Sequence, residues 1–181
     1  MTTLTTDIKD VIIIEPLVFL DERGAFFESF QQDKFNELIG RKLTFVQENE
    51  SISKKGVVRG LHFQKPPHAQ GKLVRVIKGS VLDVAVDIRK DSLTYGKYIS
   101  IVLTSENRRQ MWIPEGFAHG FVALEDDTVF QYKCTNYYNK TSEDALLWND
   151  KTLAIDWKVD QPILSPKDEI ASAFDQFNSP F

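Results

Sequence analysis

Alternating apolar and polar residues fill the middle of the chain and predict a succession of short β-strands. Residues 72–89 read KLVRVIKGSVLDVAVDIR, two β-branched runs that a lysine-glycine-serine turn separates at 78–80. In the second run, large apolar side chains occupy every other position from Val84 to Ile88, the period of two expected of a strand with unlike faces. Further strands are expected at residues 98–104 (YISIVLT), 110–113 (QMWI) and 128–135 (TVFQYKCT).

Helical periodicity is confined to the margins of the chain. Phe35, Leu38 and Ile39 stand at positions i, i+3 and i+4, and Gly40 follows them as a helix terminator. These four residues predict one short helix before the β-rich middle.

A second helix is expected to begin at Ser165. Serine is a common N-cap, Pro166 suits the first helical turn, and Asp168 supplies an acid three residues after the cap. The apolar face of this helix would come from Ile170, Phe174 and Phe177.

Together these elements predict one mainly β domain that spans residues 1–181. No repeat, low-complexity tract or Pro/Gly/Ser linker interrupts the chain. Short strands without long helices between them favour an antiparallel barrel or sandwich over a sheet with helical crossovers. We therefore expect an antiparallel jelly-roll barrel with short peripheral helices.

The charge balance and the cysteine count exclude several classes of function. The formal net charge of -4 argues against nucleic-acid binding, which normally needs a basic surface excess. A local cluster of arginine and lysine can still bind a small anion inside an acidic protein. The single cysteine, Cys134, excludes an intramolecular disulfide and any multi-cysteine metal site.

The N-terminal residues predict neither export nor membrane insertion. The first seven residues, MTTLTTD, lack the basic and apolar regions of a signal peptide. The longest early apolar run, residues 11–14, is far too short to span a bilayer. The expectation is a cytoplasmic enzyme or binding protein with no membrane partner.

His62 is the first histidine with a possible chemical role, within the segment GVVRGLHFQ at 56–64. Taken alone, a histidine more often makes a structural hydrogen bond than it performs catalysis. Its surroundings favour the second interpretation, because Arg59 is close in the sequence and further polar residues follow in the same β region. These are Gln64, Gln70, Lys72 and Arg75. Alternation places Gln70 and Lys72 on one face, so the pattern predicts an anion-binding cavity that contains a titrating group.

His119 lies in the segment WIPEGFAHGF at 112–121, whose P-x-G-x-x-H core resembles the second motif of the cupin superfamily. The histidine of that motif often binds a metal, and an upstream His-x-His with a carboxylate would complete the site. The corresponding segment here is HAQGK at 68–72, where Gln70 and Lys72 replace two expected ligands. Since an ammonium group repels a divalent ion, we expect no metal.

Tyr132 and Asp168 each allow a structural and a chemical interpretation. Tyr132 either packs in the core beside Phe130 and Cys134 or acts as a proton donor whose ring the barrel holds. Asp168 is either the acid of the helix cap or part of the site. Three further acids are expected, without other information, to be solvated on the surface: Glu28, Glu115 and Glu143.

Several long blocks, in one order along almost the whole chain, resemble the dTDP-4-dehydrorhamnose 3,5-epimerase family. These are cupin-type jelly-roll enzymes of dTDP-L-rhamnose synthesis. The similarity runs from DERGAFFE at 21–28 to LSPKD at 164–168. The central blocks are VVRGLHFQ (57–64), QGKLVRV (70–76), DVAVDIR (83–89), WIPEGFAHGF (112–121) and YKCTNYY (132–138).

The resemblance implies a role for each group of the site. His62 would be the general base, oriented by Asp168, with Tyr132 as proton donor on the opposite side and Lys72 stabilising the enolate oxygen. Tyr138 would stack on the thymine. The residues that would contact the nucleotide sugar are Arg23, Glu28, Gln47, Asn49, Arg59, Lys72, His119, Glu143 and Lys167. The resemblance also implies a homodimer, with an N-terminal strand or arm crossing to the partner.

These residue types suit proton transfer beside a ketone. Removing the proton needs a base whose pKa lies near the working pH, such as neutral histidine. It also needs a cation at the ketone oxygen. Inversion needs a second group, on the opposite face, to return a proton. No hydride moves overall, and the chain lacks a G-x-G-x-x-G loop, so no cofactor is expected.

Three alternatives stay open at this level. A mono-epimerase of another dTDP-deoxysugar pathway would use the same groups and invert only one carbon. A metal-dependent cupin oxygenase or isomerase would need a metal, which analysis of the purified protein detects. A non-catalytic sugar-binding cupin would leave the proposed catalytic groups without a purpose, and proton exchange into substrate would exclude it.

Overall fold

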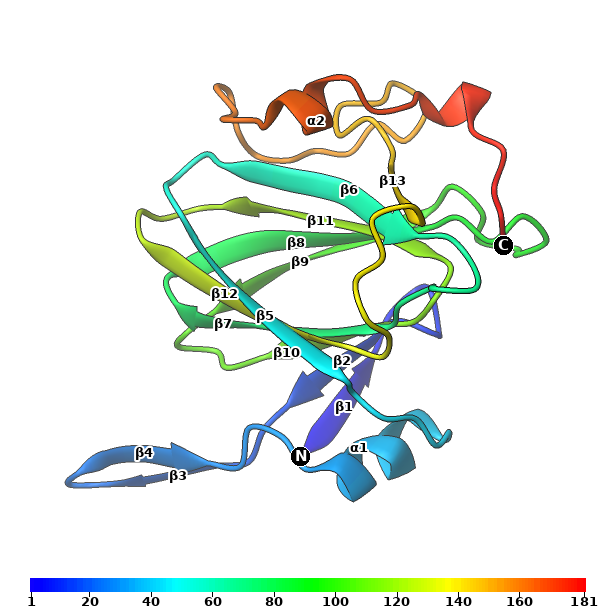
Figure 1. Cartoon of the computed structure of the whole chain (residues 1–181). Helices are drawn as coiled ribbons and strands as arrows, with labels where there is room; N and C mark the ends of the chain where they lie inside the picture. The colour runs from blue at the N-terminus through cyan, green and yellow to red at the C-terminus, as the bar shows by residue number, and fades with distance from the viewer.

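Two antiparallel sheets enclose the interior of a jelly-roll barrel in the computed structural model, which describes residues 1–181 (Figure 1). The six-stranded sheet has the order β1 (Thr2–Thr5), β2 (Ile12–Glu15), β10 (Gln110–Ile113), β7 (Lys72–Lys78), β12 (Thr128–Cys134) and β5 (Gln47–Ser53). The five-stranded sheet has the order β13 (Glu143–Ala145), β6 (Val58–Gln64), β11 (Phe117–Ala123), β8 (Ser80–Asp87) and β9 (Tyr98–Thr104). The mainly β antiparallel fold is therefore confirmed.

The strands that the alternating pattern predicts are present in the structure at the expected residues. The run at 72–89 folds as β7 and β8, and Gly79 turns the chain between them. Gly79 has a positive φ of 79°, and a Cβ there would approach Oγ1 of Thr128 to 2.5 Å. A side chain at this turn would therefore be strained and would collide with β12.

The barrel interior holds an apolar core that adjoins the candidate site, because Phe121 and Phe130 belong to both. Alternate residues of β7, β8, β11 and β12 meet in the barrel interior, among them Val74, Ala85, Phe121 and Phe130. The intervening residues of β8, including Val84 and Val86, form a second cluster under the C-terminal segments. Both faces of β8 are consequently buried, which explains why apolar residues occur on both of its faces.

The first predicted helix is confirmed as α1 (Gln32–Ile39), which ends at Gly40 with a φ of 67°. Phe35 is its buried residue and packs against Trp112, at a centroid distance of 5.3 Å. The helix thereby covers part of the outer face of the six-stranded sheet.

The second predicted helix is confirmed at its start and is wrong in its length. Ser165 caps α2, but α2 spans only Pro166–Glu169, and Ile170 is 83% exposed. Phe174 begins the short 3₁₀ helix η1 (Phe174–Gln176), and its backbone N–H donates to the Asp150 carboxylate at 2.8 Å. The two phenylalanines expected on a helix face, Phe174 and Phe177, pack instead against the cluster beneath the five-stranded sheet. Sheet burial has overridden the helical spacing.

A hairpin of β3 (Val18–Asp21) and β4 (Gly24–Phe27) projects away from the barrel (Figure 1). These strands pair only with each other, and Phe19, Leu20 and Phe26 are between 59% and 76% exposed. No helix of the chain has the length and apolar character needed to cross a membrane.

Candidate active site

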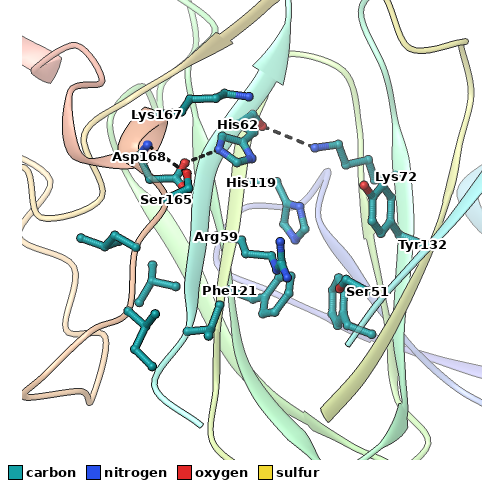
Figure 2. Close-up of a pocket in the computed structure, with 15 residues that line it drawn as sticks. Ser51, Arg59, His62, Lys72, His119, Phe121, Tyr132, Ser165, Lys167 and Asp168 are labelled. Carbon is teal, nitrogen blue, oxygen red and sulfur yellow. Dashed lines mark hydrogen bonds and ion pairs between the residues drawn. The ribbon is translucent and has the colours of Figure 1, made fainter. Parts of the chain in front are cut away.

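A cavity of about 440 Å³ lies between the two sheets of the barrel (Figure 2). The six-stranded sheet contributes Ser51, Lys72, Phe130 and Tyr132, and the five-stranded sheet contributes Arg59, His62, His119 and Phe121. The segment 163–168 forms a third wall. A smaller cavity of about 130 Å³ adjoins it and shares His62, Lys72 and Tyr132.

A β-bulge brings Arg59 and His62 to the same wall. Residues three apart on a regular strand point to opposite faces. Here His119 pairs with His62 while Phe121 pairs with Arg59, so β6 carries one more residue than β11 over this stretch. The extra residue lies beside Gly60, whose Cβ, if present, would come within 2.5 Å of the Gly120 Cα. Arg59 and His62 therefore line the same cavity, and the bulge is the cause.

His62 and Asp168 form a hydrogen-bonded pair across 106 residues of sequence. His62 Nε2 lies 2.5 Å from Asp168 Oδ1, and the Ser165 hydroxyl donates to Asp168 Oδ2 at 2.7 Å. Burial raises the pKa of Asp168, but the bonds from His62 and Ser165 and the nearby Lys167 outweigh it, so the pKa falls below 3.8. Asp168 therefore stays ionised and holds the ring through Nε2, leaving Nδ1 free. Asp168 is both the acid that bonds to the Ser165 cap and part of the site, so the two interpretations are compatible.

Lys72 lies on β7 on the other side of the cavity from the His62 ring (Figure 2). Its Nζ donates to the His62 carbonyl oxygen at a long distance of 3.4 Å. Burial lowers the pKa of Lys72, and the negative charges of Asp83 and Glu143 oppose part of that shift. The ammonium thus has few partners in the chain and is available to a bound ligand.

Tyr132 lies on β12 beside Lys72, with its ring packed against Phe130 at a centroid distance of 6.2 Å. Phe130 and Cys134, on the same face of the strand, are fully buried, as the alternation predicted. Burial raises the pKa of Tyr132 above its ordinary 10.0. The phenol therefore keeps its proton at neutral pH, as a proton donor must.

A chain of polar contacts lines the smaller cavity. The Gln47 side chain donates to Asn49 at 3.0 Å and accepts from the Tyr138 backbone N–H at 2.7 Å. The Tyr138 hydroxyl donates to Glu143 at 3.1 Å, and Lys167 pairs with the other oxygen of that carboxylate. These bonds connect Tyr138, which lines the smaller cavity, with Lys167, which lines the larger one.

Comparison with known proteins decides the family. The family model described as dTDP-4-dehydrorhamnose 3,5-epimerase matches residues 5–176. The dTDP-4-dehydrorhamnose 3,5-epimerase of Salmonella typhimurium is 58% identical, over 97% of either chain. The solved dTDP-6-deoxy-D-glucose-3,5-epimerase of Legionella pneumophila, in complex with dTDP-4-keto-L-rhamnose, is 49% identical and superposes with a TM-score of 0.94, over 98% of this chain and 94% of that one.

The chain belongs to the dTDP-4-dehydrorhamnose 3,5-epimerase family. It is thus an isomerase with a jelly-roll fold, as the sequence blocks indicated. A 3'-monoepimerase of Streptomyces bikiniensis, solved with dTDP-quinovose, is also similar, at 30% identity and a TM-score of 0.89 over 94% of this chain and 87% of that one.

Two residues that the epimerase resemblance assigned to substrate lie outside both cavities. Arg23 sits at the tip of the β3–β4 hairpin with its side chain 85% exposed, bonded to Asp21. Glu28 follows the hairpin and pairs with Lys34 at 2.7 Å on the surface. Within one chain, therefore, these two residues do not join the rest of the predicted site.

Three further expectations need correction. Arg75 does not line the cavity: it points to the outer face of the six-stranded sheet, 5.5 Å from the Phe27 ring centroid. Glu143 and Glu115 are not simply solvated, because each forms an ion pair, with Lys167 and Arg41 respectively. By contrast, Gln70 and Lys72 both line the smaller cavity, as alternation predicted.

Sequence reasoning missed Asp83, which bonds to His119 inside the barrel. A signal was present, because Asp83 begins the block DVAVDIR and shares the inward face of β8 with Ala85. No group of three or more His, Cys, Asp or Glu side chains is arranged to hold a metal ion.

Proposed function

We propose that this chain epimerises dTDP-4-dehydro-6-deoxy-D-glucose at C3 and C5, giving dTDP-4-dehydro-L-rhamnose without a cofactor. The observation that carries the proposal is the cavity in which the His62–Asp168 pair faces Lys72 and Tyr132. A base, an oxygen-binding cation and a second proton donor are the three groups that inversion beside a ketone requires.

His62 takes the proton from the carbon through Nδ1, since Nε2 is occupied by Asp168. The C–H electron pair moves into the C–C bond next to the ketone, and the oxygen becomes an enolate. Asp168 favours the imidazolium that results, because its ionised carboxylate lies 2.5 Å away. No electron leaves the substrate, so no redox partner is needed.

Lys72 stabilises the enolate oxygen. A positive charge fixed in a buried cavity favours the enolate over the neutral ketone far more than it would in water. The ammonium approaches only the His62 carbonyl oxygen, at 3.4 Å, and can exchange this weak contact for the developing oxyanion.

Tyr132 completes the inversion by giving its phenolic proton to the opposite face of the same carbon. The enolate electrons form the new C–H bond, and the ketone is restored. Tyr132 and His62 return to their starting protonation states through solvent, and the sequence is repeated at the second carbon.

The nucleotide extends from the larger cavity toward its rim. Arg59 and Lys167, which line the larger cavity, bind the diphosphate, and the exposed ring of Tyr138 beside the smaller cavity stacks on the thymine. Gln47 and Glu143 hold Tyr138 in place from two sides. His119 and Asn49 complete the proposed contacts with the sugar nucleotide.

A mono-epimerase is the second candidate, favoured by the similarity to the Streptomyces bikiniensis enzyme. Incubation with dTDP-4-keto-6-deoxy-D-glucose in D₂O, followed by NMR of the sugar, separates the two. Deuterium and inversion at both flanking carbons are expected, and inversion at one carbon alone would establish the second candidate. Absence of exchange would leave a binding protein, and exchange abolished by a chelator and restored by one metal would indicate a metal enzyme.

The proposed partner besides substrate is a second copy of the chain. An isolated two-stranded hairpin is marginally stable in water, yet β3–β4 exposes Phe19, Leu20 and Phe26. A second copy that covers these side chains would receive Arg23 and Glu28 at the rim of its own cavity. This arrangement supplies the two nucleotide contacts that one chain lacks.

The proposed location is the cytoplasm. The one cysteine, Cys134, is buried and free, so the fold needs no oxidising compartment. Cell fractionation with an antibody to the chain tests this location.

A further inference from the structure

One buried carboxylate of the barrel interior has no part in the mechanism above. Asp83 is fully buried in β8, a strand whose eight residues are all buried. Its Oδ1 lies 2.9 Å from His119 Nε2, whereas its Oδ2 is buried without any hydrogen-bond partner. A half-satisfied carboxylate among apolar side chains is costly. Packing alone therefore does not account for Asp83.

The carboxylate dictates which nitrogen of His119 carries a hydrogen. An ionised carboxylate only accepts hydrogen bonds, so His119 Nε2 must be the donor. His119 lines the larger cavity, and its Nδ1 has no partner in the chain and is not sealed off from the cavity. Nδ1 is thus the atom that His119 offers to a ligand.

The surroundings of His119 disfavour a second proton on the ring. Lys72 and Arg59 line the same cavity, and His62 is its direct neighbour in the β6–β11 pairing. Burial lowers the pKa of His119, and the opposing attraction of Asp83 is smaller. In the neutral ring that results, Nδ1 has a lone pair and accepts hydrogen bonds.

We propose that Asp83 is a positioning residue that holds His119 as the Nε2–H tautomer, so that Nδ1 accepts a hydrogen bond from a hydroxyl of the substrate's sugar. The proposal rests on the epimerase function above. A phosphate oxygen offers no proton to this lone pair. His119 pairs with the proposed base His62 and lines the same cavity, where the reacting sugar would lie, whereas Tyr138 lines only the smaller cavity.

The tautomer is directly measurable by ¹⁵N NMR, because the chain has three histidines. His119→Gln and His68→Gln assign the ring signals. We expect His119 at pH 7 to be neutral with hydrogen on Nε2, and Asp83→Asn to admit the Nδ1–H form, as an amide can donate to Nε2. A cationic or Nδ1–H ring in the unmodified protein would overturn the proposal.

Binding calorimetry tests the ligand half with dTDP, dTDP-glucose and analogues of dTDP-glucose lacking the 2- or 3-hydroxyl. Asp83→Asn should bind dTDP-glucose roughly tenfold more weakly, the size of one hydrogen bond to a buried acceptor, and bind dTDP unchanged. One of the two deoxy analogues should bind the unmodified protein roughly tenfold more weakly than dTDP-glucose does. The Asp83→Asn protein should bind that analogue and dTDP-glucose equally well. Equal losses for dTDP and dTDP-glucose would contradict the proposal.

Asp87→Asn is the matched control, since Asp87 is a fully buried acid on the same strand but bonds to Arg89 and lies outside the cavity. It should keep both the His119 tautomer and the hydroxyl discrimination. Deuterium exchange into substrate by the unmodified protein tests the epimerase function separately. A positive exchange result with an Nδ1–H His119 would refute the role of Asp83 and leave the function intact.

Discussion

Lys72 is half-buried on β7 among the groups proposed to take up and return protons, and these surroundings change the pH at which its ammonium group loses its charge. Burial lowers the pKa of Lys72 below its ordinary 10.5. The ammonium is the form that would stabilise the enolate. The contribution of Lys72 to kcat is therefore complete at pH values below the lowered pKa and is lost as the pH rises through that pKa.

We therefore expect kcat to fall on the alkaline side with a midpoint below 10.5. Lys72→Met should be slower by about 10²–10³-fold, the usual effect of removing an oxyanion-stabilising group, and should lack this alkaline fall. A kcat–pH profile of both proteins measures it. The same alkaline fall in Lys72→Met would assign it to another group.

We expect Arg59 to act on binding, because its proposed partner is a phosphate remote from the proton being moved. Its guanidinium lines the larger cavity and donates through Nε to the Ser53 hydroxyl at 3.2 Å. A hydrogen bond to a charged group is worth about 1.5–3 kcal/mol, so Arg59→Ala should weaken dTDP binding roughly tenfold or more.

Calorimetry with dTDP is the measurement, and Arg109→Ala is its control, since Arg109 pairs with Glu15 away from the cavity. Unchanged dTDP affinity in Arg59→Ala would mean that the diphosphate lies elsewhere.

At the scale of elements, the turn after β8 depends on one carboxylate. Asp87 accepts hydrogen bonds from Arg89, Ser92 and Thr94. Burial raises the pKa of Asp87, but these bonds outweigh it and bring the pKa from 3.8 to about 2. A lowered carboxylate pKa stabilises the folded state above the unfolded-state value, and this stabilisation is lost as the pH falls through the folded-state value.

Asp87→Asn should therefore lower the free energy of unfolding by about 2 kcal/mol at pH 7. The difference from the unmodified protein should shrink between about pH 4 and pH 2. Urea unfolding at a series of pH values measures it. A difference that stays constant down to pH 2 would show that the ionised carboxylate is not the cause.

Elements with a clear period could be predicted, and elements stabilised by distant contacts could not. Alternation placed β7, β8, β9 and β12 because each strand has a buried inward face. The spacing of Phe174 and Phe177 indicated a helix, but their burial is against a sheet far away in sequence. In the site, the family blocks identified His62 and Asp168, whereas the bulge that turns Arg59 toward the cavity depends on the pairing of β6 with β11.

At the scale of the whole molecule, the proposed dimer would bring the projecting hairpin of one chain to the site of the other. Arg23 at the tip of the hairpin and Phe26 on β4 are both largely exposed in the single chain. We expect a dimer in sedimentation equilibrium, and Phe26→Asp should shift it toward monomer by placing a charge in the apolar contact.

Subunit mixing tests whether the hairpin serves the partner's site. If it does, a mixed dimer of the Arg23→Ala and His62→Ala chains contains one site with both residues intact. Mixing the two weakly active proteins, with dissociation and reassembly, should restore activity toward a quarter of the unmodified level. No gain on mixing would place Arg23 at the site of its own chain, or at none.

The central claim is that His62 removes the proton and that Tyr132 returns one to the opposite face. Deuterium exchange at the two carbons tests this claim most directly. The measurement is NMR of dTDP-4-keto-6-deoxy-D-glucose in D₂O with His62→Ala and Tyr132→Phe. His62→Ala should fold and show no exchange at either carbon. Tyr132→Phe should exchange with retention, and its inversion should be slower by about 10²–10⁴-fold. Exchange and inversion that survive in His62→Ala would contradict the account.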